Sequence, residues 1–88
     1  MAITFSPKAL HDIELIKRNG LPAIKNRLER ILQSIMNTPY EGFANPEPLK
    51  YELTGKWSRE LSKKDRVVYE VSGNEINVFS ILGHYFDK

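Results

Sequence analysis

Apolar residues recur at helical spacing in two stretches of the first half of the chain. Between Ser6, a suitable N-cap, and Gly20, a common helix stop, the apolar residues share one helical face: Ala9, Leu10, Ile13 and Ile16. The second stretch begins near Pro22, ends by Pro39 and carries a longer stripe: Ile24, Leu28, Ile31, Leu32 and Ile35. The pattern predicts two amphipathic helices that form a hairpin packed against another layer.

The second half of the chain alternates between apolar and polar residues, which is typical of strands with one buried face. Four alternating runs, separated by turn sequences, are predicted as strands: residues 49–53, 56–61, 66–71 and 75–86. Residues 2–5 add a short apolar strand at the N-terminus. An N-terminal strand, a two-helix hairpin and then successive strands predict one α+β domain, residues 1–88, whose helices cover one face of a mainly antiparallel sheet.

The last two predicted strands have a testable register. A two-residue turn at Gly73–Asn74 would set four pairs: Val71 with Ile76, Tyr69 with Val78, Val67 with Ser80 and Arg66 with Ile81. In that register His84 would point away from the sheet face that carries Arg66. One extra residue in the last strand would bring the two to the same side. We therefore predict a bulge or sharp bend at Leu82–Gly83.

Composition excludes several classes of function. The 88 residues include no cysteine, so a disulfide scaffold or a thiolate metal site is excluded. The only histidines are His11, interpreted as an exposed helix residue, and His84. Phosphate-binding glycine loops and the serine-hydrolase elbow are absent from the sequence. No stretch reads as a signal peptide or membrane span, and we expect a soluble, cytoplasmic protein that needs no metal or cofactor.

The charge pattern gives a weak indication of nucleic acid. The formal net charge is +2 and the sequence pI is about 9.0. Between Lys50 and Arg66 basic residues outnumber acidic ones, six to three. This run could be an RNA-facing patch or an ordinary solvated strand surface.

Glu47 stands between two prolines in the stretch "NPEPLK". Pro48 restricts Glu47 to extended geometry, and Pro46 does the same to Asn45. The prolines could mark the entry to a strand, or they could orient a carboxylate that must point one way.

Residue types alone allow a metal-free way to cleave RNA. A carboxylate such as Glu47 can remove the 2′-hydroxyl proton, and the imidazole of His84 can protonate the departing 5′-oxygen. The guanidinium of Arg66 can stabilise the charge on the phosphorus oxygens between these steps. A non-catalytic RNA- or protein-binding module remains open at this point.

Four sequence blocks narrow these alternatives. "PYEG", "NPEPLK", "TGKWSR" and "RVVY" occur in order, and "HY" follows near the C-terminus. Together they resemble the YoeB toxins (Txe/YoeB family), members of the RelE superfamily of ribosome-dependent mRNA interferases. The close match covers residues 38–71 and the end of the chain, whereas the helical half matches in pattern only.

The resemblance implies a RelE-like fold and a set of catalytic residues. Glu47 falls on the family's general base, and Arg66 falls on the arginine that stabilises the transition state. His84 falls on the general acid, and Tyr85 on the tyrosine that helps to orient the nucleotide.

The resemblance also implies residues that bind RNA. Lys50 and Arg59 match basic positions near the substrate phosphates. Trp57 matches a family tryptophan, which could stack on a base or could anchor the core or an interface. Two departures are Glu60, where members often have a second arginine, and the extension 86–88 beyond "HY".

The function implied is the toxin of a type II toxin–antitoxin system. It would be a metal-independent endoribonuclease that cleaves mRNA in the ribosomal A site and so inhibits translation. The implied partners are a cognate YefM-like antitoxin, the ribosome with its mRNA, and a second copy in a homodimer. DNA binding by this chain is disfavoured, because the sequence lacks helix-turn-helix spacing.

Overall fold

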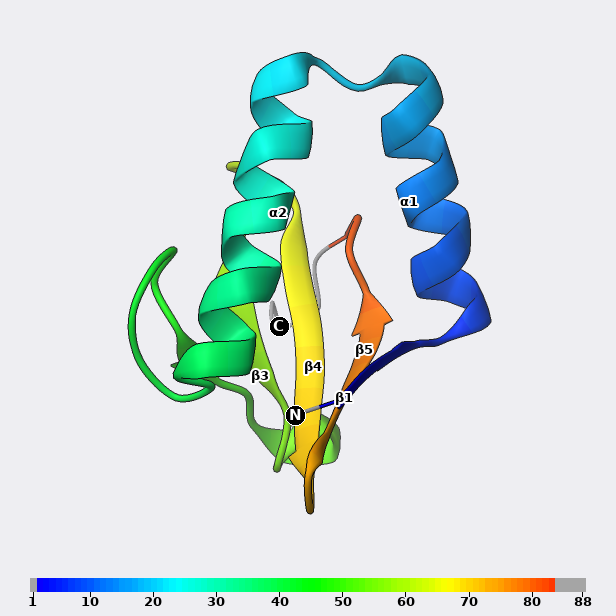
Figure 1. Ribbon diagram of the computed structural model, residues 1–88. Helices are drawn as coiled ribbons and strands as arrows, with labels where there is room; N and C mark the ends of the chain where they lie inside the picture. Colours follow the sequence, from blue (N-terminus) through cyan, green and yellow to red (C-terminus); the bar gives the residue numbers. More distant parts are fainter. Residues whose placement is uncertain (1, 84–88) are drawn as a thin grey trace.

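Five strands form one sheet, and two helices pack side by side on one of its faces (Figure 1). The computed structural model describes residues 2–83 of the chain. Its elements, in chain order, are β1 (Ala2–Phe5), α1 (Pro7–Asn19), α2 (Pro22–Asn37), β2 (Glu47–Pro48), the 3₁₀ turn η1 (Tyr51–Leu53), β3 (Trp57–Glu60), β4 (Arg66–Ser72) and β5 (Glu75–Ser80). The strand order is β1-β5-β4-β3-β2, with β1 parallel to β5 and the other neighbours antiparallel. The predicted α+β architecture is confirmed.

The ends of α1 follow from its sequence. The Ser6 hydroxyl accepts a hydrogen bond from the Ala9 N–H at 3.0 Å, as an N-cap does. Gly20 ends the helix with φ −78°, so it is not a left-handed stop. A Cβ at Gly20 would lie 2.5 Å from the Ile16 carbonyl oxygen, which explains why glycine stands there.

The core lies between the helix hairpin and the covered face of the sheet. The predicted stripe of α2 is confirmed: Leu28, Ile31 and Ile35 are buried against sheet residues such as Tyr69 and Ile76. The stripe of α1 needs a correction. Leu10 is 55% exposed, whereas Asp12 is buried with 2% of its surface accessible.

The prediction of a strand at residues 49–53 is wrong. The strand is the preceding pair Glu47–Pro48, and the chain then turns through η1 with Tyr51 at φ 60°. The apolar residues of this run do not form one buried face: Leu49 is its one buried residue, and Tyr51 is 83% exposed. Alternation in a short run does not by itself make a strand.

The hairpin of β4 and β5 follows the predicted register over its first half. Val71 pairs with Ile76 and Tyr69 with Val78, but Val68 then pairs with Ser80, so Phe79 is the extra residue. The predicted pairs of Val67 with Ser80 and Arg66 with Ile81 are therefore wrong. The extra residue lies closer to the turn than Leu82–Gly83, and Phe79 packs under the Lys56 ammonium, 4.9 Å from the ring centroid.

The predicted bend at Leu82–Gly83 is confirmed. β5 ends at Ser80, residues 81–83 bend, and Gly83 has φ 131°, a conformation that favours glycine. The shifted register lets the Arg66 N–H donate to the Gly83 carbonyl at 3.1 Å. His84 and Tyr85 lie outside the described residues. The predicted direction of the His84 side chain therefore stays a prediction.

Candidate active site

Glu47 and Arg66 meet on the sheet face opposite the helices. Side chains alternate along a strand, so Arg59 and Val67 point toward the helices while Ser58 and Arg66 point away from them. Glu47 pairs with Ser58 across β2 and β3 and shares that face. The Glu47 Oε1 atom lies 3.1 Å from Arg66 Nη2. The prediction that these two residues lie together is confirmed.

Arg66 is held from two further directions. Its Nε–H donates to Ser58 Oγ at 2.8 Å, and its Nη2 donates to the Asn45 carbonyl at 3.3 Å. Its side chain is 11% exposed, whereas that of Glu47 is 56% exposed. The guanidinium is thus fixed against the sheet, and the carboxylate faces solvent beside it. Such a pair can receive a proton from a ligand and can attract its phosphate.

Arg59 lies inside the protein, and this corrects the prediction that it contacts RNA phosphates. The residue is 0% exposed. Its Nε–H donates to the Tyr69 hydroxyl at 3.0 Å, and its other N–H groups donate to four acceptors: Ser34 Oγ and the carbonyls of Thr38, Glu41 and Phe43. A guanidinium has five N–H donors, so none is left for a phosphate.

Trp57 and Lys50 have different surroundings. Trp57 points to the helix side of the sheet, where it packs against the core and contacts the Tyr40 ring at a centroid distance of 5.0 Å. Of its two interpretations, the anchor fits this position and the base-stacking platform does not. Lys50 is exposed, two positions after Pro48, the last residue of β2.

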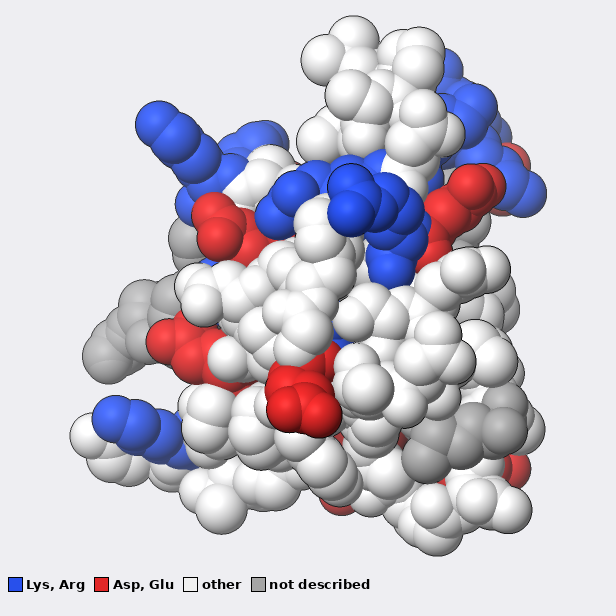
Figure 2. Space-filling model, turned by 60° about the vertical axis from the view of Figure 1, so that its left-hand side comes forward, with Lys and Arg blue, Asp and Glu red and all other residues white. Residues whose placement is uncertain are grey.

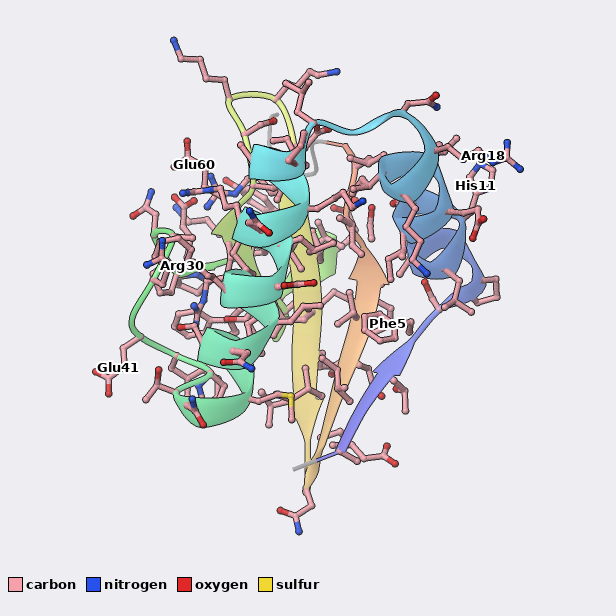
Figure 3. The ribbon with its side chains drawn as sticks, turned by 45° about the horizontal axis from the view of Figure 1, so that its top comes forward. Phe5, His11, Arg18, Arg30, Glu41 and Glu60 are labelled. Carbon is pink, nitrogen blue, oxygen red and sulfur yellow. The ribbon has the colours of Figure 1, made fainter. Side chains whose placement is uncertain are left out.

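The basic run from Lys50 to Arg66 does not form one continuous patch, because its arginines are buried or held and Lys56 lies 4.0 Å from Glu70. On the face shown in Figure 2, Lys and Arg side chains gather above the centre, with acidic groups beside and below them. His11 lies on the outer side of α1, close to Arg18 (Figure 3), and is exposed as expected.

Asp12 holds the bent segment that follows β5, a role that the sequence reasoning missed. Its Oδ2 accepts hydrogen bonds from the N–H groups of Ile81 and Leu82, at 2.9 and 3.0 Å. The Lys8 ammonium donates to the same oxygen at 2.6 Å and to the Leu82 carbonyl at 2.8 Å. A signal was present: Asp12 is three positions after Ala9 and four before Ile16, on the buried stripe.

The same contacts set the ionisation of Asp12. Burial alone would raise the pKa of this carboxyl group, but hydrogen bonds from the Leu82 N–H, the Lys8 ammonium and the Ile81 N–H together hold the pKa below its ordinary value of 3.8. Asp65 completes the arrangement, because its Oδ1 accepts from the Gly83 N–H at 2.9 Å. Three successive N–H groups, those of residues 81–83, therefore donate to carboxylates.

Over residues 2–83 the structure contains no cluster of three or more histidine, cysteine, aspartate or glutamate side chains that could hold a metal ion. In the same part of the chain, no helix is long and apolar enough to cross a membrane.

Comparisons with known proteins agree on one family. Residues 5–85 match the family described as YoeB-like toxin of bacterial type II toxin-antitoxin system. The Toxin YoeB of Synechocystis is 32% identical over 85 residues, which cover 97% of this chain and 98% of that protein.

Solved structures give the same result. The YoeB/ParE toxin from Agrobacterium tumefaciens superposes with a TM-score of 0.91 at 29% identity, over 97% of this chain and all of that one. YoeB from Staphylococcus aureus, 36% identical, was solved in a complex with YefM (TM-score 0.86) and as a dimer (0.87), each covering 97% of this chain and 98% of the other.

Proposed function

The chain belongs to the YoeB family of toxins of type II toxin–antitoxin systems, and from this premise we propose that it is an endoribonuclease that cleaves mRNA in the ribosomal A site. The observation that carries the proposal is the Glu47–Arg66 pair, 3.1 Å apart on the sheet face that the helices leave uncovered. Cleavage of mRNA there would inhibit translation, and the toxin would act in the cytoplasm, where ribosomes work.

In the proposed reaction, Glu47 takes the proton of a ribose 2′-hydroxyl, and the 2′-oxygen attacks the adjacent phosphorus. The bond from phosphorus to the 5′-oxygen breaks, and His84 gives that oxygen its proton. The products are a 2′,3′-cyclic phosphate and a 5′-hydroxyl. Arg66 stabilises the negative charge that builds on the phosphorus oxygens, Lys50 attracts a neighbouring phosphate, and Tyr85 helps to orient the nucleotide.

Two side chains perform both proton transfers, so the proposed reaction uses no metal or cofactor. Glutamate and histidine are modest acid–base catalysts, and alignment of the 2′-oxygen with the scissile bond can supply much of the acceleration. The ribosome would provide that alignment, which makes it a required partner.

The remaining partners follow from the S. aureus relative. That YoeB was solved with YefM and also as a dimer. We infer that this chain binds a YefM-like antitoxin that holds it inactive, and that it forms a homodimer.

The proposal is tested with Glu47→Gln and purified ribosomes programmed with mRNA. Loss of the base should slow cleavage by about 10²–10⁴-fold, because general base catalysis contributes that much. Glu41→Gln is the matched control: Glu41 is an exposed carboxylate of the loop that precedes β2, directed away from the sheet (Figure 3), and its loss should leave the rate unchanged. If wild type and Glu47→Gln arrest growth equally and the mRNA stays uncut, the chain is a binding module and not a nuclease. If Glu47→Gln cleaves at the wild-type rate, Glu47 is not the base.

A further inference from the structure

The loop of residues 38–46 delivers Glu47 to the site in an unfavourable backbone conformation. Ala44 has φ 71° and Asn45 has φ 58°, so two successive residues with side chains are left-handed just before Pro46 and Glu47. Such a conformation is costly for Ala44 and less so for an asparagine such as Asn45, and it persists where the surrounding structure holds it.

Arg59 holds the first part of this loop from inside the protein. Its guanidinium donates to the carbonyls of Thr38, Glu41 and Phe43 at distances of 2.7 to 3.0 Å. These carbonyls come from one short stretch that has no strand partner. A carbonyl removed from water needs a donor, and Arg59 donates to all three. The carbonyls of Thr38 and Glu41 also accept from within the loop, from the Glu41 N–H and the Thr38 hydroxyl respectively.

Tyr69 extends the contact to the start of the loop. Its hydroxyl accepts from Arg59 Nε at 3.0 Å and donates to the Pro39 carbonyl at 2.5 Å. Burial raises the pKa of Tyr69 above its ordinary value, although the Arg59 guanidinium acts in the opposite direction. The hydroxyl therefore keeps its proton and remains a donor.

The last part of the loop is tied to the strands that carry the site. The Glu60 N–H donates to the Ala44 carbonyl at 2.8 Å, and Arg66 Nη2 donates to the Asn45 carbonyl. Phe43 is fixed from outside by two cations, with the Arg27 and Arg30 guanidinium carbons 4.9 and 4.0 Å from its ring centroid. Contacts therefore fix the loop along its length, and Arg59 makes those to its first part.

We propose that Arg59 is a positioning residue for catalysis: together with Tyr69 it fixes loop 38–46 so that the Glu47 carboxylate lies beside Arg66. This inference rests on the proposed function. Arg59 does not touch the substrate in this role and acts through Glu47. A residue that only stabilised the fold would not change the rate of the chemical step in the folded protein.

The test uses Tyr69→Phe, which removes one hydroxyl, and Arg59→Lys, which keeps the charge but loses the planar array of donors. Single-turnover cleavage is measured on ribosomes programmed with mRNA, over a range of toxin concentrations. The maximal rate should fall about 10-fold for Tyr69→Phe and about 100-fold for Arg59→Lys, because small misplacements of a catalytic group have effects of this size. The toxin concentration that gives half the maximal rate should stay the same, and amide exchange in loop 38–46 should become faster.

Ile76→Val is the control for lost stability, because Ile76 lies in the core on β5 and not in the loop. It should cleave at the wild-type maximal rate. Full maximal rates in Tyr69→Phe and Arg59→Lys, with cleavage still dependent on Glu47, would overturn this inference alone. An mRNA left intact by wild type would overturn the proposed function, whereas full cleavage by Glu47→Gln would remove the role of Glu47 on which this inference rests.

Discussion

Two irregular segments reach the site, and the protein holds them with side chains of opposite charge. Loop 38–46 follows the C-terminal end of α2 and is fixed by a buried cation, Arg59, which donates to its carbonyls. Segment 81–83 follows the end of β5 and is fixed by two anions, Asp12 and Asp65, which accept from its N–H groups.

The difference shows which backbone groups each segment leaves without partners. The carbonyls that Arg59 serves lie at and beyond the C-cap of α2, in a loop that has no neighbouring strand to donate to them. A strand that bends away from its neighbour instead leaves N–H groups to satisfy. The charge of each buried side chain matches the backbone group that it serves.

The largest loss of stability is expected when the buried cation, Arg59, is replaced. Arg59→Met keeps an apolar stem but removes five buried hydrogen bonds of the guanidinium, so the free energy of unfolding should fall by about 3–5 kcal/mol. Urea unfolding followed by circular dichroism measures the change. A loss below about 1 kcal/mol would show that water or a rearranged loop replaces the guanidinium.

A smaller loss of stability is expected when one of the anions, Asp12, is replaced. Asp12→Asn retains one oxygen but removes the charge, and the free energy of unfolding should fall by about 1.5–3 kcal/mol, the range for hydrogen bonds to charged groups. Amide exchange at Ile81 and Leu82 should become faster while loop 38–46 stays protected. Glu14→Gln, an exposed carboxylate on the same helix, is the matched control and should change stability by less than about 0.5 kcal/mol. Equally faster amide exchange in loop 38–46 and in segment 81–83 would contradict the claim that separate contacts fix the two segments.

The smallest effect is the dependence on pH. The pKa of Asp12 is lower in the folded protein than its ordinary value of 3.8, so in acid the unfolded chain binds more protons than the folded one. The stability that this carboxylate contributes is present above about pH 5 and is lost as the pH falls through the folded pKa. Unfolding measured between about pH 5 and pH 2 should therefore show a shallower acid dependence in Asp12→Asn than in wild type. Equal slopes would indicate that other carboxylates carry the acid sensitivity.

The sequence predicted the features that depend on local pattern. The stripe of α2 repeats with helical spacing, and Leu28, Ile31 and Ile35 are buried as that spacing requires. The "NPEPLK" block pointed to Glu47 as an oriented carboxylate, and the structure places it beside Arg66. Glu47, which precedes Pro48, is extended in β2, which here is only Glu47–Pro48. The same expectation for Asn45 before Pro46 is wrong, because Asn45 has φ 58°.

The features that sequence could not give depend on distant groups. Arginine is usually exposed, and the burial of Arg59 follows from carbonyls that lie 16 to 21 positions earlier in the chain. The extra residue in β5 is Phe79, which contacts Lys56 of a different strand connection. A pattern of apolar and polar letters contains neither contact.

The most direct test of the central claim is the chemistry of the cut ends. Wild-type toxin, ribosomes and a defined mRNA are incubated, and the fragments are analysed by mass spectrometry. Attack by the 2′-oxygen, with Glu47 as the base, predicts an upstream fragment that ends in a 2′,3′-cyclic phosphate and a downstream fragment that begins with a 5′-hydroxyl. A 3′-hydroxyl and a 5′-phosphate at the cut would contradict the mechanism.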